Sequence, residues 1–180
     1  MQRSERRILT THAGSLPRTP ELIALLVRRS RREPVDPVEL ERAIRDSTRR
    51  VVARQLAAGV DVGNDGEQAR ESFFTYVQHR MSGFGGTSER PIMRDITHFP
   101  SYLALRLPDF SRTQVSLMAA PRAVGEVRYV DRSALERECA LFQEVVREQD
   151  GRFVEPFMTA PSPGIIAARS EEHTSELQSR

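Results

Sequence analysis

A long helical pattern that ends directly before a strand pattern is the feature that most restricts how this chain can fold. Residues 36–59 read DPVELERAIRDSTRRVVARQLAAG, with an acidic N-cap at Asp36, a proline in the first turn and a left-handed stop at Gly59. Residues 60–62 follow at once with the pattern of a buried strand. Such a pairing predicts a parallel sheet with helices on its outside. The helical side chains expected on the inner face are Leu40, Ile44, Ser47, Val51, Val52 and Leu56.

An alternation of strand and helix patterns also precedes residue 36. Residues 8–12, ILTTH, predict a short first strand that ends in a loop rich in glycine and proline. A helix is expected to begin near Thr19, with Pro20 at its first position. Its apolar side chains at helical spacing are Leu22, Ile23, Leu25, Leu26 and Val27.

A second round of the pattern follows residues 81–121, whose glycine and proline content is too high for one helix. The GFGG at residues 83–86 is interpreted as a flexible linker, because no Lys-Ser/Thr follows it as in a phosphate-binding loop. A third strand is expected at residues 123–127 and a fourth at 153–158. Between them, residues 133–149 predict a helix with Ser133 as its cap and an inner face made of Leu135, Cys139, Phe142, Val145 and Val146.

Four strands with their helices define the predicted fold class as α/β, the N-terminal half of a (β/α)8 barrel with about four β/α units. An open doubly wound sheet is the alternative. In both architectures the functional groups gather at the C-terminal ends of the strands. The polar or glycine residues expected there are His12, Gly14 and Ser15 after the first strand, Asp65, Gly66 and Glu67 after the second, and Thr159 and Ser162 after the fourth.

Composition excludes several classes of partner. No stretch approaches the roughly 20 consecutive apolar residues that span a bilayer, and no apolar signal-peptide core follows the N-terminus. We expect a cytoplasmic protein without a membrane partner. Nucleic acid is not expected either, because 25 acidic residues are interspersed among the 27 basic ones and no basic stripe carries interleaved aromatic residues.

Three motifs together resemble a known family. They are ILTTHAGSLPRT at residues 8–19, GVDVGNDGEQARESFFTYV at 59–77 and FMTAPSPG at 157–164. In this order they resemble the cobalamin-independent methionine synthase family, in particular its short, single-barrel members related to the C-terminal catalytic domain. The likeness covers roughly residues 7–168. It implies a zinc-dependent (β/α)8 barrel that transfers a methyl group to a thiol, most directly from a methyl donor to homocysteine. In the related epoxyalkane:coenzyme M transferases the transferred group is a larger alkyl group.

The resemblance also implies roles for individual residues. The contacts that hold the amino-acid end of homocysteine would fall on Ala13, Gly14, Ser15 and Glu67. Ser15 offers an N–H and a hydroxyl to a carboxylate, and Glu67 is a natural partner for an ammonium group. His12 and Asp65 are possible supporting residues, and Arg70 is expected to pair with a carboxylate and orient it.

The zinc ligands of the family are a His-x-Cys pair with a later Glu and Cys. This chain contains no His-x-Cys, and its one cysteine, Cys139, is expected in the core. The zinc ligands are therefore expected beyond Ala168, and the 180-residue chain is expected to be inactive by itself. The methyl or alkyl donor stays open between folate, a corrinoid and other donors, because the family's folate-associated Trp is absent.

Two other functions remain open from the sequence. A porphyrinogen decarboxylase-like enzyme would share the barrel but would need a cavity rich in arginine. A half-barrel fragment without independent function would expose unpaired strand edges. The residues of the predicted site also have simpler interpretations: Asp65 and Glu67 as helix caps, Ser15 as a turn cap and His12 as a core residue.

The last twelve residues, 169–180, read RSEEHTSELQSR and break the pattern. Most of this string resembles the translation of a common sequencing-library adapter. The sequence therefore predicts a partial catalytic barrel over residues 1–168 and a tail of non-biological origin over 169–180, with the natural chain continuing past Ala168.

Overall fold

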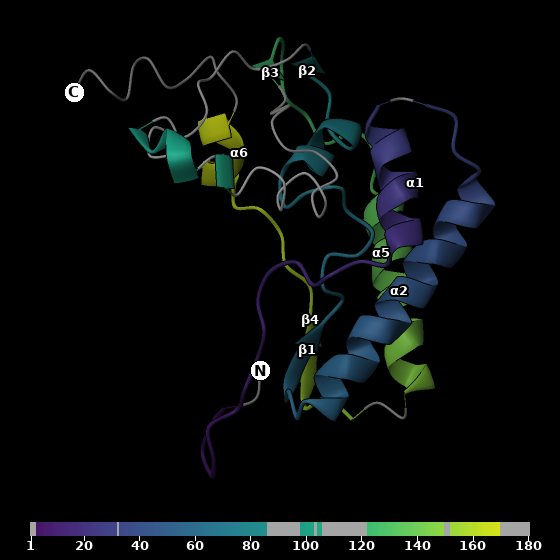
Figure 1. The fold of residues 1–180 in the computed structure, drawn as a ribbon, viewed down its shortest axis with the longest axis vertical. Coiled ribbons are helices and arrows are strands. Elements are labelled where there is room, and N and C mark those ends of the chain that lie inside the picture. Colours follow the sequence, from purple (N-terminus) through teal and green to yellow (C-terminus); the bar gives the residue numbers. More distant parts are fainter. Residues whose placement is uncertain are drawn as a thin grey trace.

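The computed structural model of the chain describes residues 3–31, 33–85, 98–102, 104–105, 122–149 and 152–169. Its centre is a small parallel sheet with helices on one side (Figure 1). The helices whose bounds the structure describes in full are α1 (Pro20–Ser30), α2 (Pro37–Ala57), α5 (Ser133–Glu148), α6 (Pro163–Arg169) and the short 3-10 helix η1 (Thr75–His79). The strands are β1 (Val62–Asn64), β2 (Phe84–Gly85), β3 (Arg122–Ala123) and β4 (Glu155–Phe157).

Strand β1 lies at the centre of the parallel sheet. It pairs with β4 in the register Val62↔Glu155, Gly63↔Pro156 and Asn64↔Phe157. On its other side, Thr11 forms a parallel bridge with Val62, and the carbonyl of Thr10 accepts hydrogen bonds from the N–H groups of Asp61 and Val62 at 3.1 and 3.0 Å. The first strand predicted at residues 8–12 is therefore reduced to a single bridge, because few of its backbone groups are placed opposite β1.

The predicted third strand at residues 123–127 is wrong as a member of the parallel sheet. Its first residue belongs to β3, which pairs with β2 in antiparallel fashion, Phe84 opposite Ala123 and Gly85 opposite Arg122. The glycine stretch interpreted as a linker thus contributes a strand. Three parallel segments, rather than four, adjoin in the described part of the chain, and the half-barrel stays a prediction. Much of the segment 81–121 lies outside the described residues.

Helices α1 and α2 begin as predicted. The side chain of Thr19 accepts a hydrogen bond from the N–H of Leu22 at 3.3 Å, and Asp36 accepts one from Val38 at 2.9 Å. The end of α2 is a Schellman motif, in which the N–H of Gly59 reaches the carbonyl of Leu56 and the N–H of Val60 reaches that of Gln55, both at 3.0 Å. Gly59 has φ of 74°, a conformation that favours glycine. These local signals fix the direction in which α2 delivers the chain to β1.

Helix α5 begins at the predicted residue but with a different cap. Ser133 is its first residue, and the carboxylate of Asp131 accepts hydrogen bonds from the Ser133 N–H at 2.8 Å and hydroxyl at 2.6 Å. A carboxylate two residues earlier supplies the acceptor that was expected from Ser133. Leu135, predicted inside, is 38% exposed because the packed part of α5 is centred farther along, at Phe142 and Val145.

The core is formed where the helices pack on each other and on the sheet. One cluster joins α1 to α2 through Leu22, Leu25, Leu26 and Ala43. A second joins α2 to α5 and to the segment just before β4 through Val52, Phe142, Val145 and Phe153. The helices thus hold the outer side of the sheet in place, as expected for a parallel sheet.

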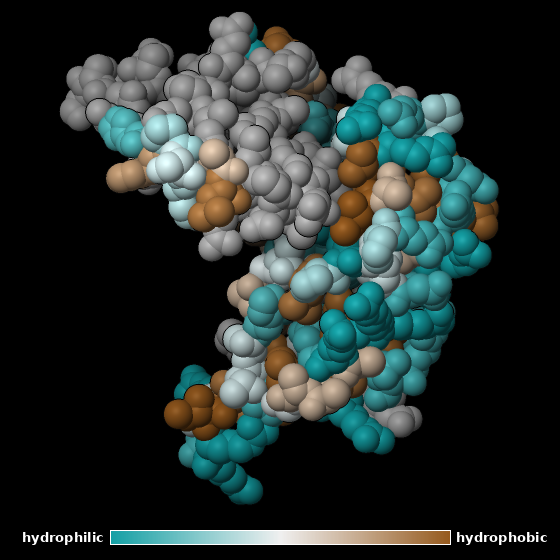
Figure 2. Space-filling view, in the orientation of Figure 1, coloured by the Kyte–Doolittle hydropathy of each residue, from teal (hydrophilic) through white to brown (hydrophobic). Residues whose placement is uncertain are grey.

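The outer surface of α2 is polar, and Figure 2 shows mainly hydrophilic side chains along it. Ion pairs link it to its neighbours, Arg42 to Glu21 on α1 at 3.3 Å and Arg45 to Glu144 on α5 at 2.6 Å. Within the described residues, no helix has both the length and the apolar character needed to cross a membrane.

Gly63 tests the packing of the sheet against its helices. A methyl group at this buried position would overlap the aromatic ring of Phe153, so the ring would have to move out of the core. We expect Gly63→Ala to lower the free energy of unfolding by about 1–3 kcal/mol, the usual cost of overpacking. Chemical denaturation of both chains measures the difference. The control is Gly164→Ala in α6, where the nearest described atom outside the helix backbone is the Ser162 hydroxyl oxygen, 3.8 Å from an added methyl group. Equal effects of the two substitutions would contradict this packing.

Candidate active site at the carboxyl ends of the parallel strands

Three loops meet where the parallel segments end. They are the loop after Thr11, the loop after β1 and the loop after β4. The first two are joined by hydrogen bonds from the N–H of Leu16 to the carbonyl of Gly66 at 3.0 Å and from the Gln68 amide to the carbonyl of Leu16 at 2.9 Å. Their convergence follows from the parallel pairing, which brings the C-terminal ends of all the strands to one edge.

Glu67 lies at the centre of these loops. Its side-chain oxygen Oε2 accepts a hydrogen bond from the hydroxyl of Ser15, and Oε1 accepts one from the hydroxyl of Thr159 at 2.8 Å. The residue is only 1% exposed. One carboxylate therefore joins all three loops, and two of its contacts come from segments more than fifty positions away in the chain.

The backbone of Glu67 is held in an unusual conformation. Its φ of 57° lies in the left-handed region, which costs a residue other than glycine about 1–3 kcal/mol. Neighbouring polar groups hold the turn: Asp65 accepts a hydrogen bond from the Glu67 N–H at 3.2 Å, and Arg18 donates one to the Glu67 carbonyl at 2.8 Å. These contacts fix the direction of the Glu67 carboxylate. Backbone strain of this kind is common at functional sites.

Asp65 lies two residues before Glu67 in the same turn. It is 4% exposed, and burial raises the pKa of its carboxyl group, although the charge of Arg70 acts in the opposite direction. Asp65 and Glu138 also border a cavity of about 560 Å³ lined by residues of α1, α2, η1 and α5. Asp65 thus belongs both to the Glu67 turn and to the lining of this cavity.

Arg70 is buried, at 2% exposure, and contacts both α5 and the loop after β4. Its guanidinium donates to the carbonyl of Thr159 at 2.5 Å and lies 3.4 Å from the carboxylate of Glu138. It also covers the ring of Tyr76 at 4.8 Å. Burial lowers the pKa of Arg70, but Glu138 and its other neighbours outweigh burial, so the pKa is raised overall. The carboxylate expected beside Arg70 is thus Glu138.

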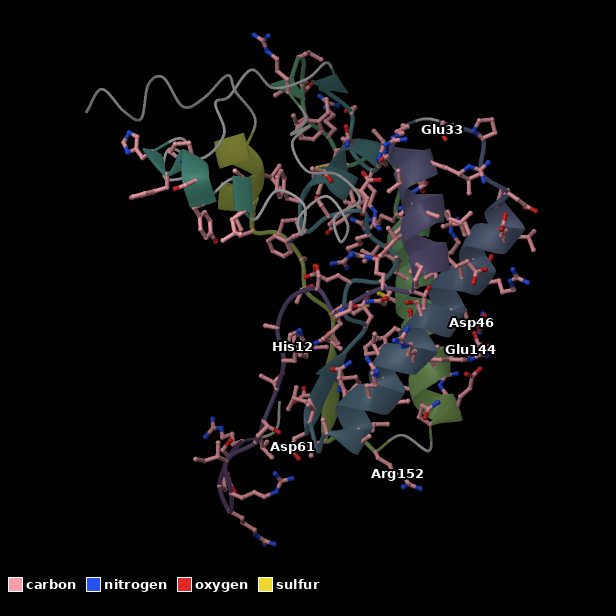
Figure 3. The ribbon with its side chains drawn as sticks, viewed as in Figure 1. His12, Glu33, Asp46, Asp61, Glu144 and Arg152 are labelled. Atoms are coloured by element: carbon pink, nitrogen blue, oxygen red, sulfur yellow. The ribbon has the colours of Figure 1, made fainter. Side chains whose placement is uncertain are left out.

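The other residues of the predicted site lie nearby. Ala13 and Ser15 are exposed, and His12 and Gly14 are half-buried. Figure 3 shows His12 on the side of the sheet away from α2 and α5, where Asp46 and Glu144 lie. Nε2 of His12 is buried and has no hydrogen-bond partner among the described residues.

Two residues predicted after the fourth strand have different surroundings. Thr159 reaches Glu67, as described above. Ser162 instead accepts a hydrogen bond from the N–H of Ile165 at 3.2 Å and so caps the start of α6. Only the first of them belongs to the cluster around Glu67.

Sequence reasoning missed Arg18 and Glu138. Arg18 follows the Gly-Ser pair, and its guanidinium donates to the carbonyls of Glu67 and Arg70. Its position inside the first motif was the available signal. Glu138 gave no signal, because its spacing on α5 resembles that of the other charged residues of the helix. Only the packing of α5 against the sheet identifies it.

The described residues do not fit a zinc site. In the ranges that the structure describes, no three His, Cys, Asp or Glu side chains are grouped so that they could hold a metal ion. The thiol of Cys139 faces the sulfur of Met158 at 3.8 Å. His79 pairs with Glu71 at 2.8 Å. We therefore assign no metal-dependent step to these side chains.

Comparisons with known proteins bear on the family of the chain. A family model described as "Cobalamin-independent synthase, Catalytic domain" matches residues 8–99. The methionine synthase of Sulfolobus acidocaldarius is 37% identical over 75 residues, which are 42% of this chain and 22% of that protein. Because the family model covers half of the chain, the chain belongs to the cobalamin-independent methionine synthase family.

A solved structure supports the fold. The B12-independent methionine synthase from Shewanella sp. W3-18-1, in complex with selenomethionine, aligns with a TM-score of 0.58 and 22% sequence identity. The alignment covers 94% of this chain and 42% of that protein. The chain therefore spans less than half the length of this relative and about a fifth of the curated one.

The buried carboxyl group of Asp65 predicts a specific pH dependence. Its folded-state pKa lies above the ordinary value of 3.8, so its ionisation removes stability as the pH rises through that range. Asp65→Asn does not titrate, so its stability relative to the unmodified chain should rise between about pH 3 and pH 7. Urea denaturation across this range is the measurement.

Asp61→Asn is the matched control, because the pKa of Asp61 is shifted in the opposite direction to that of Asp65. Hydrogen bonds from Arg7 and Thr10 hold the pKa of Asp61 well below its usual range. The ionised form therefore stabilises the fold, and that stability is lost as the pH falls. Asp61→Asn should lose stability relative to the unmodified chain at neutral pH and little at low pH. If the stability of both variants relative to the unmodified chain changed with pH in the same direction, the burial assigned to Asp65 would be contradicted.

Proposed function

We propose that the loops around Glu67 bind the amino-acid end of a thiol substrate, homocysteine, for S-methyl transfer by the protein to which this chain belongs. The observation that carries the proposal is the buried Glu67 carboxylate held between the hydroxyls of Ser15 and Thr159. Membership of the cobalamin-independent methionine synthase family supports methyl transfer as the reaction class.

The carboxylate of Glu67 has hydrogen-bond acceptor capacity left for an ammonium partner. Among the described residues each of its oxygens accepts one side-chain hydrogen bond, and a carboxylate oxygen can accept two. A substrate ammonium would add a charge-assisted hydrogen bond in a site that excludes much of the water. The ligand would approach from the side of Ser15, which is exposed.

The substrate carboxylate would lie against the loop after Thr11. The hydroxyl of Ser15 is already bonded to Glu67, so its backbone N–H is the group left for a ligand. Ala13 is exposed, and none of the described residues lies within 4 Å of a methyl group added at Gly14, so among these residues the loop is open to a ligand. Ser15 would then join the two ends of the amino acid, its N–H to the carboxylate and its hydroxyl to Glu67.

The chemistry at sulfur requires loss of the thiol proton, because the thiolate is the nucleophile and a free thiol has a pKa near 8.5. The resemblance to the family implies that zinc supplies this activation. The described residues form no zinc site. Their proposed role is to bind and orient the amino-acid end of the substrate.

The Glu67 carboxylate favours an ammonium-bearing thiol over a sulfonate-bearing one. It is 1% exposed, and each of its oxygens accepts a hydrogen bond from a hydroxyl group. A sulfonate placed against Glu67 would meet carboxylate oxygens instead of donors and would be repelled. The same carboxylate opposes the carboxylated tetrapyrroles of porphyrinogen decarboxylase-like enzymes.

Glu67→Gln tests the proposal. The substitution keeps the shape of the side chain and removes its charge, so the hydrogen bond to the substrate ammonium loses its charge assistance. We expect the preference of the 180-residue chain for homocysteine over 4-mercaptobutanoate, which lacks the amino group, to fall by about tenfold or more. Isothermal titration calorimetry with both thiols measures the preference.

Glu33→Gln is the control for charge alone. Glu33 is exposed and lies on the loop between α1 and α2, where Figure 3 labels it. This variant should keep the preference of the unmodified chain. An unchanged preference in Glu67→Gln would remove Glu67 from the binding site and with it the proposed function.

A further inference from the structure

Arg70 reaches the candidate site through Thr159. Its guanidinium donates to the Thr159 carbonyl at 2.5 Å, and the Thr159 hydroxyl donates to Oε1 of Glu67 at 2.8 Å. Arg70 lies three residues after Glu67 in the chain, yet its side chain contacts Thr159, which is 89 positions away. The two hydrogen bonds form a continuous link from Arg70 to the carboxylate.

A buried ion cluster fixes the guanidinium of Arg70. Nε and one terminal nitrogen of Arg70 lie 3.4 Å from Oε2 of Glu138, while the other oxygen of Glu138 accepts a hydrogen bond from Arg80. Arg70 and Arg80 both cover the ring of Tyr76, at 4.8 and 4.4 Å from its centre. The side chains of Arg70, Arg80 and Glu138 are 2%, 9% and 10% exposed. Charges buried to this extent keep their arrangement, because breaking one pair leaves an uncompensated buried charge.

From this geometry we propose that Arg70, anchored by Glu138, is a positioning residue for Glu67. It holds the backbone of Thr159 at the distance from which the Thr159 hydroxyl orients the Glu67 carboxylate toward a substrate ammonium. This inference rests on the proposed function and extends it to helix α5, which contributes Glu138 without reaching the substrate.

The fork shape of arginine is essential to this role. One terminal nitrogen of Arg70 serves Thr159 while Nε and the other terminal nitrogen face Glu138. A lysine has one compact ammonium and cannot span both partners in the same geometry. Arg70→Lys therefore keeps the charge but should release one of the two contacts.

Arg80 provides a matched control within the same cluster. It is buried, pairs with Glu138 and covers Tyr76, as Arg70 does. No hydrogen bond joins its side chain to Thr159 or to Glu67 in the described part of the chain. Arg80→Lys keeps a cation beside Glu138 and leaves both hydrogen bonds of the link from Arg70 through Thr159 to Glu67 in place.

The experiment measures calorimetric binding of homocysteine and of 4-mercaptobutanoate to the 180-residue chain and its variants. The ratio of the two affinities reports how well Glu67 meets the ammonium group, whereas a general loss of structure weakens both ligands alike. Arg70→Lys should reduce this ratio by at least about fivefold, on the scale of a charge-assisted hydrogen bond, and Arg80→Lys should keep it within about twofold. Thr159→Val, which removes the hydroxyl at nearly constant shape, should reduce the ratio as Arg70→Lys does.

Each outcome decides the proposal. A ratio retained in Arg70→Lys, or lost equally in Arg80→Lys, would overturn the positioning role. If Arg70→Lys does not fold, Thr159→Val decides, and a retained ratio there overturns the link. Glu67→Gln separates the two claims: loss of the ratio in Glu67→Gln with retention in Arg70→Lys leaves the proposed function standing and removes only the role of Arg70.

Discussion

Parallel pairing on both sides of β1 determines where the loops of this chain meet. Thr11 bridges Val62 on one side, and β4 pairs with the whole of β1 on the other. Because the three segments run in the same direction, the loops that follow them open at one edge. The helices stabilise this arrangement from outside, through apolar clusters that join α1 to α2 and α2 to α5 and β4. The candidate site is a consequence of this shared edge.

The turn after β1 carries Glu67, the residue that contacts both other loops at this edge. Glu67 has a left-handed backbone and a buried carboxylate, both unfavourable by themselves, and the loops from the neighbouring segments provide the compensating contacts. Arg70 continues the same network into α5 by way of Glu138. Glu67 and Arg70 are thus both held by partners from distant parts of the chain, so the site and the fold form together.

Local signals predicted the helices well, and long-range contacts account for what was missed. Thr19, Asp36 and Gly59 cap or end helices through contacts with residues close to them in the chain, so their roles can be predicted from the sequence. The edge location of Ser15, Glu67 and Thr159 also followed from the alternation of strands and helices. The pairing of Ala123 with Phe84 could not be read, because a short strand has no pattern that selects its partner or direction. Glu138 was missed for the same reason, since only tertiary packing brings it to Arg70.

We propose that Glu67 contacts the amino group of a thiol substrate at the shared edge of the parallel segments. A crystal structure of the 180-residue chain with homocysteine bound would show this contact. We expect the substrate nitrogen within about 2.7–3.2 Å of a Glu67 carboxylate oxygen, with the substrate carboxylate against the loop of Ser15. Homocysteine bound elsewhere, with Glu67 still shared only between Ser15 and Thr159, would contradict it.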